Sequence, residues 1–384
     1  MFVVCGALLT QAQPSKAVGP PDRYIVVLKE GVSNPGRAAD GMARRYGLGV
    51  GFVYSHALKG FSAVIPNERV AAVRADERVG YVEPDKTYAA AQTLPWGINR
   101  VDADRSSTIA NNGSGAVSNI RAYIIDTGID KTHPDLNVVN HVNFTGDSKN
   151  QDCGDPRRRG GHGTHVAGTL AAKDNARYVV GVAPGAPLVG VKVLGCNGSG
   201  SVTNIIAGIE WVTKNANKPA VANVSISGPV STSLDAAVRN SAASGILYSV
   251  AAGNNGQPAC NYSPARAGRT KTPDDTWKKN NGIVTTAATN DNNGETWDSN
   301  YGACVDLWAP GASIPSTKLG GGTITKSGTS MASPHVGGGG ALYLHSHTSA
   351  DPSSVEGALK DAARRPGTHS KDDNPIRLEN VNAF

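Results

Sequence analysis

The sequence predicts an α/β protein with a mostly parallel sheet flanked by helices, preceded by a small α+β unit. Nearly continuous apolar runs alternate with helical stretches in the longer part of the chain, as buried parallel strands alternate with crossover helices. The composition changes near residue 90 and separates this part from the first unit. Only 18% of the 384 residues are charged, which is too few for a long disordered chain or a coiled coil.

Residues 1–21 are typical of the remnant of an export signal followed by a linker. An apolar block at 2–9 precedes Thr10-Gln11-Ala12, which has the small residues of a cleavage site. We therefore expect a secreted, extracellular protein. No apolar run approaches the ~20 residues of a membrane-spanning helix, so we expect no membrane association once the signal is removed.

The cysteines agree with export. Cys5 lies within the signal, and the even number that remains favours two disulfides in an exported chain. These cysteines are Cys153, Cys196, Cys260 and Cys304. They allow three pairings, and their spacing alone does not choose among the three.

Residues 22–90 are expected to form the small α+β unit. Strand-like runs occur at 23–29, 57–64 and 79–84, and helical patterns lie between them at 37–46 and 67–75. A linker of small residues follows at 87–93.

Residues 91–384 hold the predicted parallel sheet. Its strands are expected at 122–125, 188–194, 222–226, 245–252 and 283–288. The 37 basic residues are balanced by 31 acidic ones, without the concentrated basic stripe that nucleic-acid binding requires. We therefore expect no nucleic-acid partner.

Three polar residues stand where strands end or helices begin. Asp126 follows a buried strand, at the edge of the sheet where α/β proteins build sites. His162 lies between two glycines, and Ser330 precedes Pro334, which a helix tolerates only near its start. Taken singly, they could be a turn aspartate, a buried histidine and an N-cap serine. His162 and His165 could also form a metal pair, although the Glu of an H-E-x-x-H motif is missing.

Together these residues indicate acyl-transfer chemistry. A serine hydroxyl needs an imidazole to accept its proton and a carboxylate to hold that imidazole in the right tautomer. Asn254 ends another apolar strand, and its side-chain amide could donate a hydrogen bond to an oxyanion.

Three segments around these residues resemble the signatures of the subtilisin-like serine proteases, or subtilases. They are Ile125-Asp126-Thr127-Gly128, residues 161–169 and residues 328–336. Gly253-Asn254 is similar to the oxyanion motif of the family. The segments 192–201, 260–265 and 300–307 most resemble the proteinase K branch and its bacterial aqualysin-like members. Residues 22–90 separately resemble the inhibitor-type propeptide of such zymogens.

The resemblance implies a doubly wound, subtilisin-like catalytic domain at 91–384, with Ser330 as nucleophile, His162 as general acid/base and Asp126 as its orienting carboxylate. Asn254 and the Ser330 backbone N–H would hold the oxyanion. A peptide substrate would bind as an extra strand between residues 198–200 and residues 225–227, and Ala252 and Gly253 would line the pocket for the side chain before the scissile bond. The residues concerned are Gly198, Ser199, Gly200, Ser225, Ile226, Ser227, Ala252 and Gly253.

The same resemblance implies a monomeric, secreted endopeptidase that acts on polypeptides and matures by cutting itself between Tyr88 and Gln92. The released propeptide would then act as a transient inhibitor. Neutral aromatic or aliphatic residues are expected before the scissile bond, because no Asp or Glu lies in the segments that would line this pocket. Ser227 stands where relatives usually carry Gly and could crowd the pocket entrance.

The aqualysin-like branch also implies the pairs Cys153–Cys196 and Cys260–Cys304. It implies no catalytic cofactor, but at least one structural calcium, for which Asp306 would be a ligand. Near Asp102, relatives often offer better ligands than Asn99 and Ala103. Residues 271–281 look like an insertion beside the Asp306 site, and four successive glycines at 337–340 would require very close packing of the helix behind Ser330.

Two alternatives remain open. An inactive subtilase-like binding module is one, although the four candidate catalytic groups are intact. An α/β-hydrolase-type esterase is the other, because residues 328–332 nearly match G-x-S-x-G. That fold needs its acid and histidine after the serine, where only Asp361 and His369 could serve.

Overall fold

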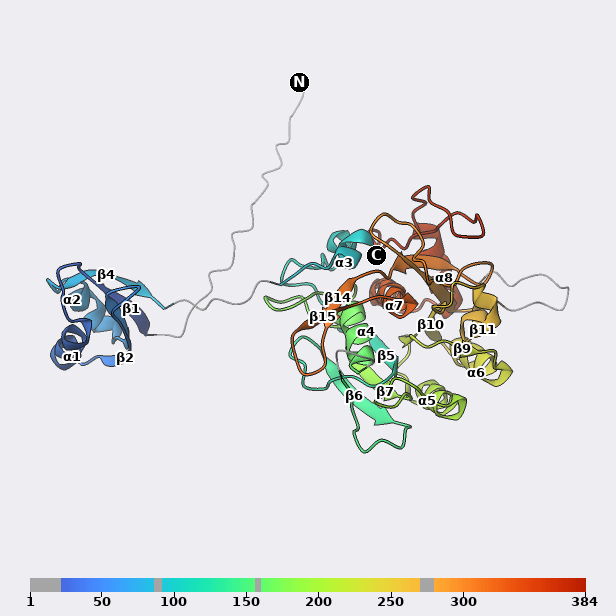
Figure 1. The fold of residues 1–384 in the computed structure, drawn as a ribbon, viewed down its shortest axis with the longest axis horizontal. Helices are drawn as coiled ribbons and strands as arrows, with labels where there is room; N and C mark the ends of the chain where they lie inside the picture. The colour runs from blue at the N-terminus through green and yellow to red at the C-terminus, as the bar shows by residue number, and fades with distance from the viewer. Residues whose placement is uncertain (1–21, 86–91, 156–159, 270–279) are drawn as a thin grey trace, which may run out of the picture. The chain divides into compact units, whose positions relative to one another are not determined.

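The computed structural model describes residues 22–85, 92–155, 160–269 and 280–384. The chain forms two compact units, Met1–Ala89 and Ala90–Phe384 (Figure 1). The predicted signal segment, most of the self-cleavage linker and most of the insertion at 271–281 lie outside the described residues. In the part of the chain that is described, no helix has the length and apolar character needed to cross a membrane.

The first unit is a four-stranded antiparallel sheet in the order β2-β3-β1-β4. Its elements are β1 (Arg23–Leu28), α1 (Pro35–Tyr46), β2 (Gly49–Tyr54), β3 (Gly60–Val64), α2 (Val70–Arg74) and β4 (Val79–Pro84). Met42, Phe61 and Val73 are fully buried and hold helices and sheet together. The sequence pattern missed β2, because glycines interrupt this edge strand and most of its side chains face solvent.

The second unit contains a seven-stranded sheet in the order β13-β12-β10-β8-β5-β7-β6. All neighbouring strands in it are parallel. The strands are β5 (Arg121–Asp126), β6 (Val138–Asn143), β7 (Leu188–Lys192), β8 (Ala220–Val224), β10 (Ile246–Ala251), β12 (Ile283–Thr289) and β13 (Leu307–Pro310). The predicted α/β fold is therefore confirmed. The chain proceeds from β5 toward one edge and then toward the other, so the sheet is doubly wound.

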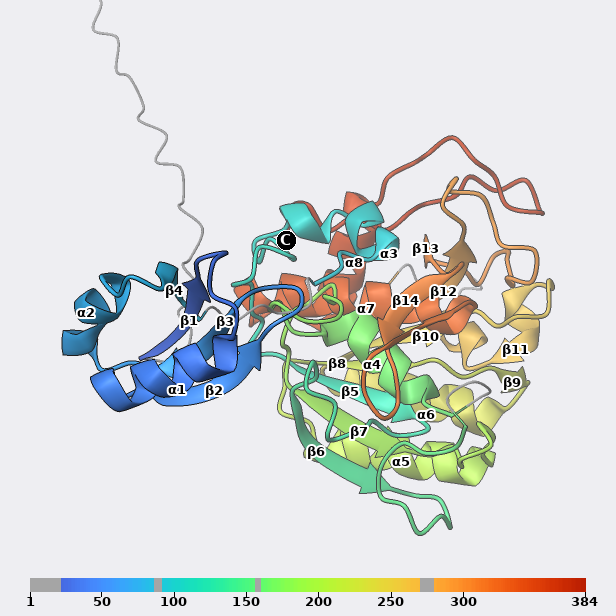
Figure 2. The same ribbon diagram turned by 60° about the vertical axis from the view of Figure 1, so that its left-hand side comes forward.

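Helices cover both faces of this sheet (Figure 2). Ala122 and Ile124 of β5 belong to the core under α4 (His162–Ala171), α7 (Thr329–Ser346) and α8 (Pro352–Ala362). Tyr123 and Ile125 of the same strand face the opposite core, under α5 (Val202–Asn215) and α6 (Thr232–Ala243). Because successive side chains of a strand point to opposite faces, a strand buried on both faces has the continuous apolar sequence seen here.

The remaining elements are short. They are α3 (Trp96–Arg100), the paired strands β9 (Gly228–Pro229) and β11 (Tyr262–Ser263), the hairpin β14 (Ile314–Thr317) and β15 (Thr323–Lys326), and the 3₁₀ turns Asn67–Arg69, Ala103–Arg105, Ala259–Asn261 and Ala265–Gly268.

The four glycines of α7 are packed as closely as the sequence required. A Cβ added at Gly338 would lie 2.5 Å from Val182 Cβ, and one at Gly340 would lie 2.2 Å from Leu247 Cδ2. Both distances are too short for carbon atoms, so only glycine lets α7 approach its neighbours this closely.

Glu379 is a buried acid beneath the same helix. It is fully buried, and neither of its carboxylate oxygens has a hydrogen-bond partner among the described residues. Burial raises the pKa of this carboxyl well above its ordinary value. Between the ordinary and the raised pKa, the native state binds more protons than the unfolded state, so stability falls as pH rises through this window.

We expect Glu379→Met to remove this loss of stability. The variant should gain stability relative to the parent chain at pH 9 and gain much less at pH 5, because the parent pays no ionisation penalty at the lower pH. Guanidinium unfolding at the two pH values measures the difference. A gain of equal size at both would show that ionisation of Glu379 does not contribute.

Candidate active site

Asp126 and His162 are brought together at the carboxyl edge of the sheet. Asp126 ends β5 and is fully buried, and His162 is the first residue of α4. His162 Nδ1 lies 2.8 Å from Asp126 Oδ1 and 2.9 Å from Oδ2. Burial opposes a charge on the imidazole, but the Asp126 carboxylate outweighs it, and the pKa of His162 is raised. The ring is thus oriented by a carboxylate and prepared to accept a proton at Nε2.

Ser330 lies in the first turn of α7, where backbone N–H groups are not used by the helix. Its hydroxyl donates to the Ser225 carbonyl at 3.2 Å, and no hydrogen bond joins it to His162 in the described structure. Catalytic hydrogen bonds are often long before substrate binds, so this geometry does not exclude the pair.

Asn254 is anchored to the residue before the serine. Its Oδ1 accepts from Thr329 N at 2.8 Å and from Thr329 Oγ1 at 2.9 Å. Because the amide oxygen is occupied in this way, the Nδ2 donors are left to point elsewhere. This arrangement supports the predicted role of Asn254 as an oxyanion donor.

Pro334 lies inside α7, deeper than the sequence suggested, and Ser225 explains why it is tolerated. Proline has no N–H, so the carbonyl four residues earlier, that of Ser330, loses its helical partner. The Ser225 hydroxyl donates to this carbonyl at 2.9 Å. A segment predicted to bind substrate therefore holds the residue predicted to be the nucleophile.

Asp152 was not predicted, yet it links the two halves of the Asp–His pair. Its Oδ1 accepts from Thr127 Oγ1 at 2.8 Å, and its Oδ2 accepts from Thr164 N and Oγ1 at 2.9 and 2.5 Å. Thr127 Oγ1 in turn accepts from Gly163 N at 2.9 Å. Asp152 is 2% exposed and thus fixes the residues next to Asp126 and His162. In the sequence, only Thr127 after Asp126 and Thr164 after His162 indicate that a polar partner is needed here.

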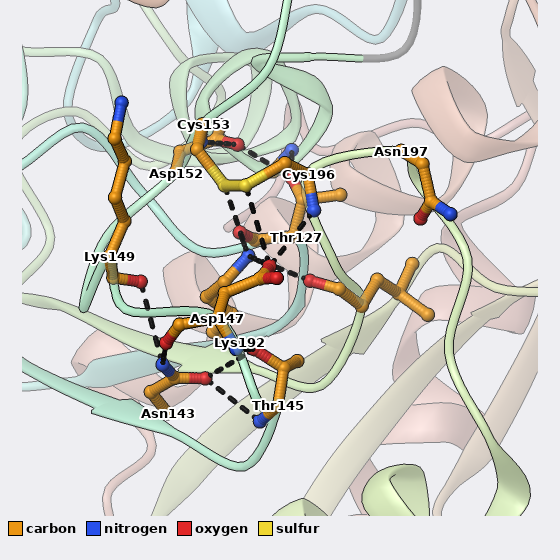
Figure 3. Close-up of a disulfide and its surroundings, with 12 residues drawn as sticks. Thr127, Asn143, Thr145, Asp147, Lys149, Asp152, Cys153, Lys192, Cys196 and Asn197 are labelled. Atoms are coloured by element: carbon orange, nitrogen blue, oxygen red, sulfur yellow. Dashed lines mark hydrogen bonds and ion pairs between the residues drawn. A yellow bond between two sulfur atoms is a disulfide. The ribbon is translucent and has the colours of Figure 1, made fainter.

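The disulfides Cys153–Cys196 and Cys260–Cys304 are both present, as predicted. Figure 3 shows the first of them beside Asp147 and the buried Lys192. Lys192 Nζ donates to Thr127 O at 3.0 Å and lies 3.3 Å from Asp147 Oδ2. Lys192 therefore fixes the backbone at the end of β5, next to Asp126.

Asp147, Cys153 and Cys196 form the one cluster of potential metal ligands found within the described ranges. Their chemistry does not fit a metal ion, because the two sulfurs are bonded to each other and the Lys192 ammonium lies against the carboxylate.

The predicted substrate-binding residues all follow strands at this edge of the sheet. Residues 198–200 follow β7, where Gly195 N donates to Ser199 O at 2.8 Å to close a turn. Residues 225–227 follow β8, and Ala252 and Gly253 follow β10. Ser227 stands against Gly253: a Cβ on Gly253 would lie 2.6 Å from Ser227 Oγ. This contact is consistent with the expectation that Ser227 narrows the entrance of the pocket for the residue before the scissile bond.

His165 and Asp306 have other surroundings. His165 is fully buried and its Nε2 donates to the Ile314 carbonyl at 2.9 Å, while burial lowers its pKa to about 3. It is a packed histidine and not half of a metal pair. Asp306 lies 2.6 Å from the ammonium nitrogen of Lys360, so the residues present do not fit a calcium ion at this carboxylate.

Comparisons with known proteins agree with the geometry. Residues 119–378 match the subtilase family, and residues 23–91 match the peptidase inhibitor I9 family. The extracellular serine proteinase of Thermus sp. (strain Rt41A) is 39% identical over 374 residues, which cover 88% of this chain and 84% of that protein. Alkaline serine exoprotease A of Vibrio alginolyticus is 38% identical over 366 residues, which cover 89% of this chain and 64% of that protein.

A solved structure is also similar. The crystal structure of a cold-adapted subtilisin-like serine proteinase matches with a TM-score of 0.63 at 36% identity, covering 75% of this chain and 98% of that chain.

Proposed function

Because the chain belongs to the subtilase family, we propose that it is a secreted serine endopeptidase that cleaves peptide bonds through an acyl-enzyme intermediate. The observation that carries the proposal is the His162–Asp126 pair, with both carboxylate oxygens within 2.9 Å of Nδ1, at the same sheet edge as the segments that hold Ser330. His162 is the imidazole that pairs with a carboxylate here, rather than the His369 that an α/β-hydrolase would need.

In the proposed mechanism, Ser330 Oγ attacks the scissile carbonyl while His162 Nε2 takes its proton. Asp126 accepts the hydrogen bond from Nδ1–H and stabilises the imidazolium that forms. The Asn254 amide and the Ser330 N–H donate to the developing oxyanion. The leaving amine receives the proton from His162, and water then repeats the sequence to release the acyl group.

The inhibitor-family match of residues 23–91 supports a zymogen. We propose that the catalytic unit cuts the chain near residues 88–92 and that the released first unit inhibits the protease until it is degraded.

A structural calcium is proposed only at positions other than Asp306.

A fluorophosphonate probe tests the mechanism. It should label Ser330 in the processed protein, because it reacts with serines that a neighbouring base activates. His162→Ala should abolish labelling, whereas His347→Ala, which changes an exposed histidine outside the site, should not. Labelling that survives His162→Ala would contradict the assigned base, and an unlabelled processed protein would support the inactive binding module.

Specificity gives a separate prediction. The residues proposed to line the pocket are uncharged, so a lysine or arginine before the scissile bond would be buried without a partner. We expect a peptide library to show preference for neutral aromatic or aliphatic residues there, and Ser227→Gly to admit larger side chains. Strict selection of Arg or Lys would overturn this prediction.

A further inference from the structure

Asp306 stands at the far edge of the sheet, directly before β13, and its carboxylate is held from two sides. Thr285 N donates to Oδ2 at 2.9 Å. Oδ1 lies 2.6 Å from Lys360 Nζ, which extends from helix α8. A calcium ion binds carboxylate oxygens at about 2.3–2.6 Å. The ammonium is thus as close to Oδ1 as a bound calcium would be, and a calcium ion at the same oxygen would be repelled by it.

A second carboxylate also contacts this ammonium. Glu356, one turn earlier on α8, is 1% exposed and its Oε1 lies 2.5 Å from Lys360 Nζ. Its Oε2 accepts from Asn281 N at 2.7 Å and from Gly282 N at 2.8 Å. Asn280 Oδ1 is a further acceptor, 3.4 Å from the ammonium. One cation thus bridges two carboxylates and an amide oxygen, the type of ligands that a structural calcium would use.

We infer that Lys360 is a built-in structural cation that takes the place of calcium between Asp306 and Glu356. It joins α8 to the loops before β12 and β13, and the link is part of the chain rather than dependent on an ion in the medium. Removing the ammonium would leave the buried Glu356 carboxylate and the partly buried Asp306 carboxylate without their shared cation, which is costly unless another cation enters.

Asp102 shows a similar arrangement, because its carboxylate is bonded to the Arg364 guanidinium and to Asn380 Nδ2. A second acidic residue near the expected calcium positions is therefore also neutralised from within the chain.

The test compares Lys360→Met with the parent chain, both carrying Ser330→Ala to prevent autolysis. With the proposed nucleophile absent from every sample, the result does not depend on the proposed function. In chelator, Lys360→Met should melt roughly 5–15 °C below the parent. In millimolar calcium it should recover several degrees more than the parent gains, because the ion can enter between the freed carboxylates.

Two controls make the comparison specific. Lys371→Met removes a lysine that lies 3.1 Å from Glu295, outside this cluster, and should show no added response to calcium. Adding Asp306→Asn to Lys360→Met should abolish the recovery. The inference is overturned if Lys360→Met gains no more from calcium than the parent does.

A measurement on the parent chain keeps the inference testable if Lys360→Met does not fold. Calorimetric titration with calcium should give the same binding for the parent and for Asp306→Asn. Binding that Asp306→Asn eliminates would show that calcium displaces Lys360, and would overturn the inference.

Discussion

Ser330→Ala is expected to lower kcat by about 10⁶-fold, the size of loss known for the triad serine in a relative from this family. The change removes the only oxygen proposed to form the acyl-enzyme, while His162, Asp126 and the oxyanion donors remain. The same variant should stay unprocessed, since the proposed self-cleavage would use the same nucleophile. Hydrolysis of a chromogenic peptide and N-terminal sequencing measure the two effects.

Ser327→Ala is the matched control for that variant. Ser327 precedes the same helix and its hydroxyl accepts from Ser313 N at 2.8 Å, so it is a nearby serine with a different partner. Its replacement should leave kcat and processing nearly unchanged. A Ser330→Ala chain made in a protease-free host that acquires the mature N-terminus would disprove self-cleavage.

Asn254→Leu is expected to lower kcat by about 10²–10³-fold with little change in KM. The bound substrate has no oxyanion, which develops as the transition state and tetrahedral intermediate form, so a donor to it contributes to kcat rather than to substrate binding. Leucine also removes the oxygen that accepts hydrogen bonds from Thr329. Asn254→Asp therefore separates the loss of the amide donor from the loss of this acceptor. Aspartate keeps an oxygen for Thr329 N but has no amide donor, so its kcat should fall at least as far.

Asn255→Leu serves as the neighbouring control, because this exposed residue is held through its backbone N–H to Asn300 Oδ1 at 3.0 Å. Its kcat should stay within a fewfold of the parent. Equal losses in Asn254→Leu and Asn255→Leu would mean that the loop, and not the Asn254 amide, is responsible.

The central strands were predictable because burial on both faces leaves a continuous apolar sequence, as in β5 and β10. Strands β6 and β13 were not, since β6 contains two asparagines and a histidine and β13 is four residues long and ends in proline. Such edge strands lack the pattern that two-sided burial imposes. The sequence motifs around Asp126 and His162 located the pair that the structure brings together.

Residues that act through other residues could not be found in this way. The role of Asp152 depends on three segments meeting in space, and a single aspartate before a cysteine carries no such information. The threonines after Asp126 and His162 indicate that a polar partner is needed, but they do not identify it. Asp306 was expected to bind calcium because of the family resemblance, whereas its partner in the structure, Lys360, lies 54 positions later on another element. The disulfide pairing followed from family resemblance, because spacing left three possibilities.

The glycine run of α7 also limits how this protein can be engineered or can evolve. Replacing a glycine by alanine stabilises a protein by about 0.4–1 kcal/mol where the backbone and the space allow it. At Gly338 and Gly340 the added methyl group would displace Val182 or Leu247 and move α7, whose first turn contains Ser330. Helix α7, which has the most glycines to replace, therefore cannot be stabilised by alanine at these positions. Mutations toward heat resistance should begin elsewhere. Gly36 of α1 has room for an added Cβ, because the nearest atom would lie 3.5 Å away. It belongs to the first unit, however, so a change there would stabilise the proposed propeptide and not the protease.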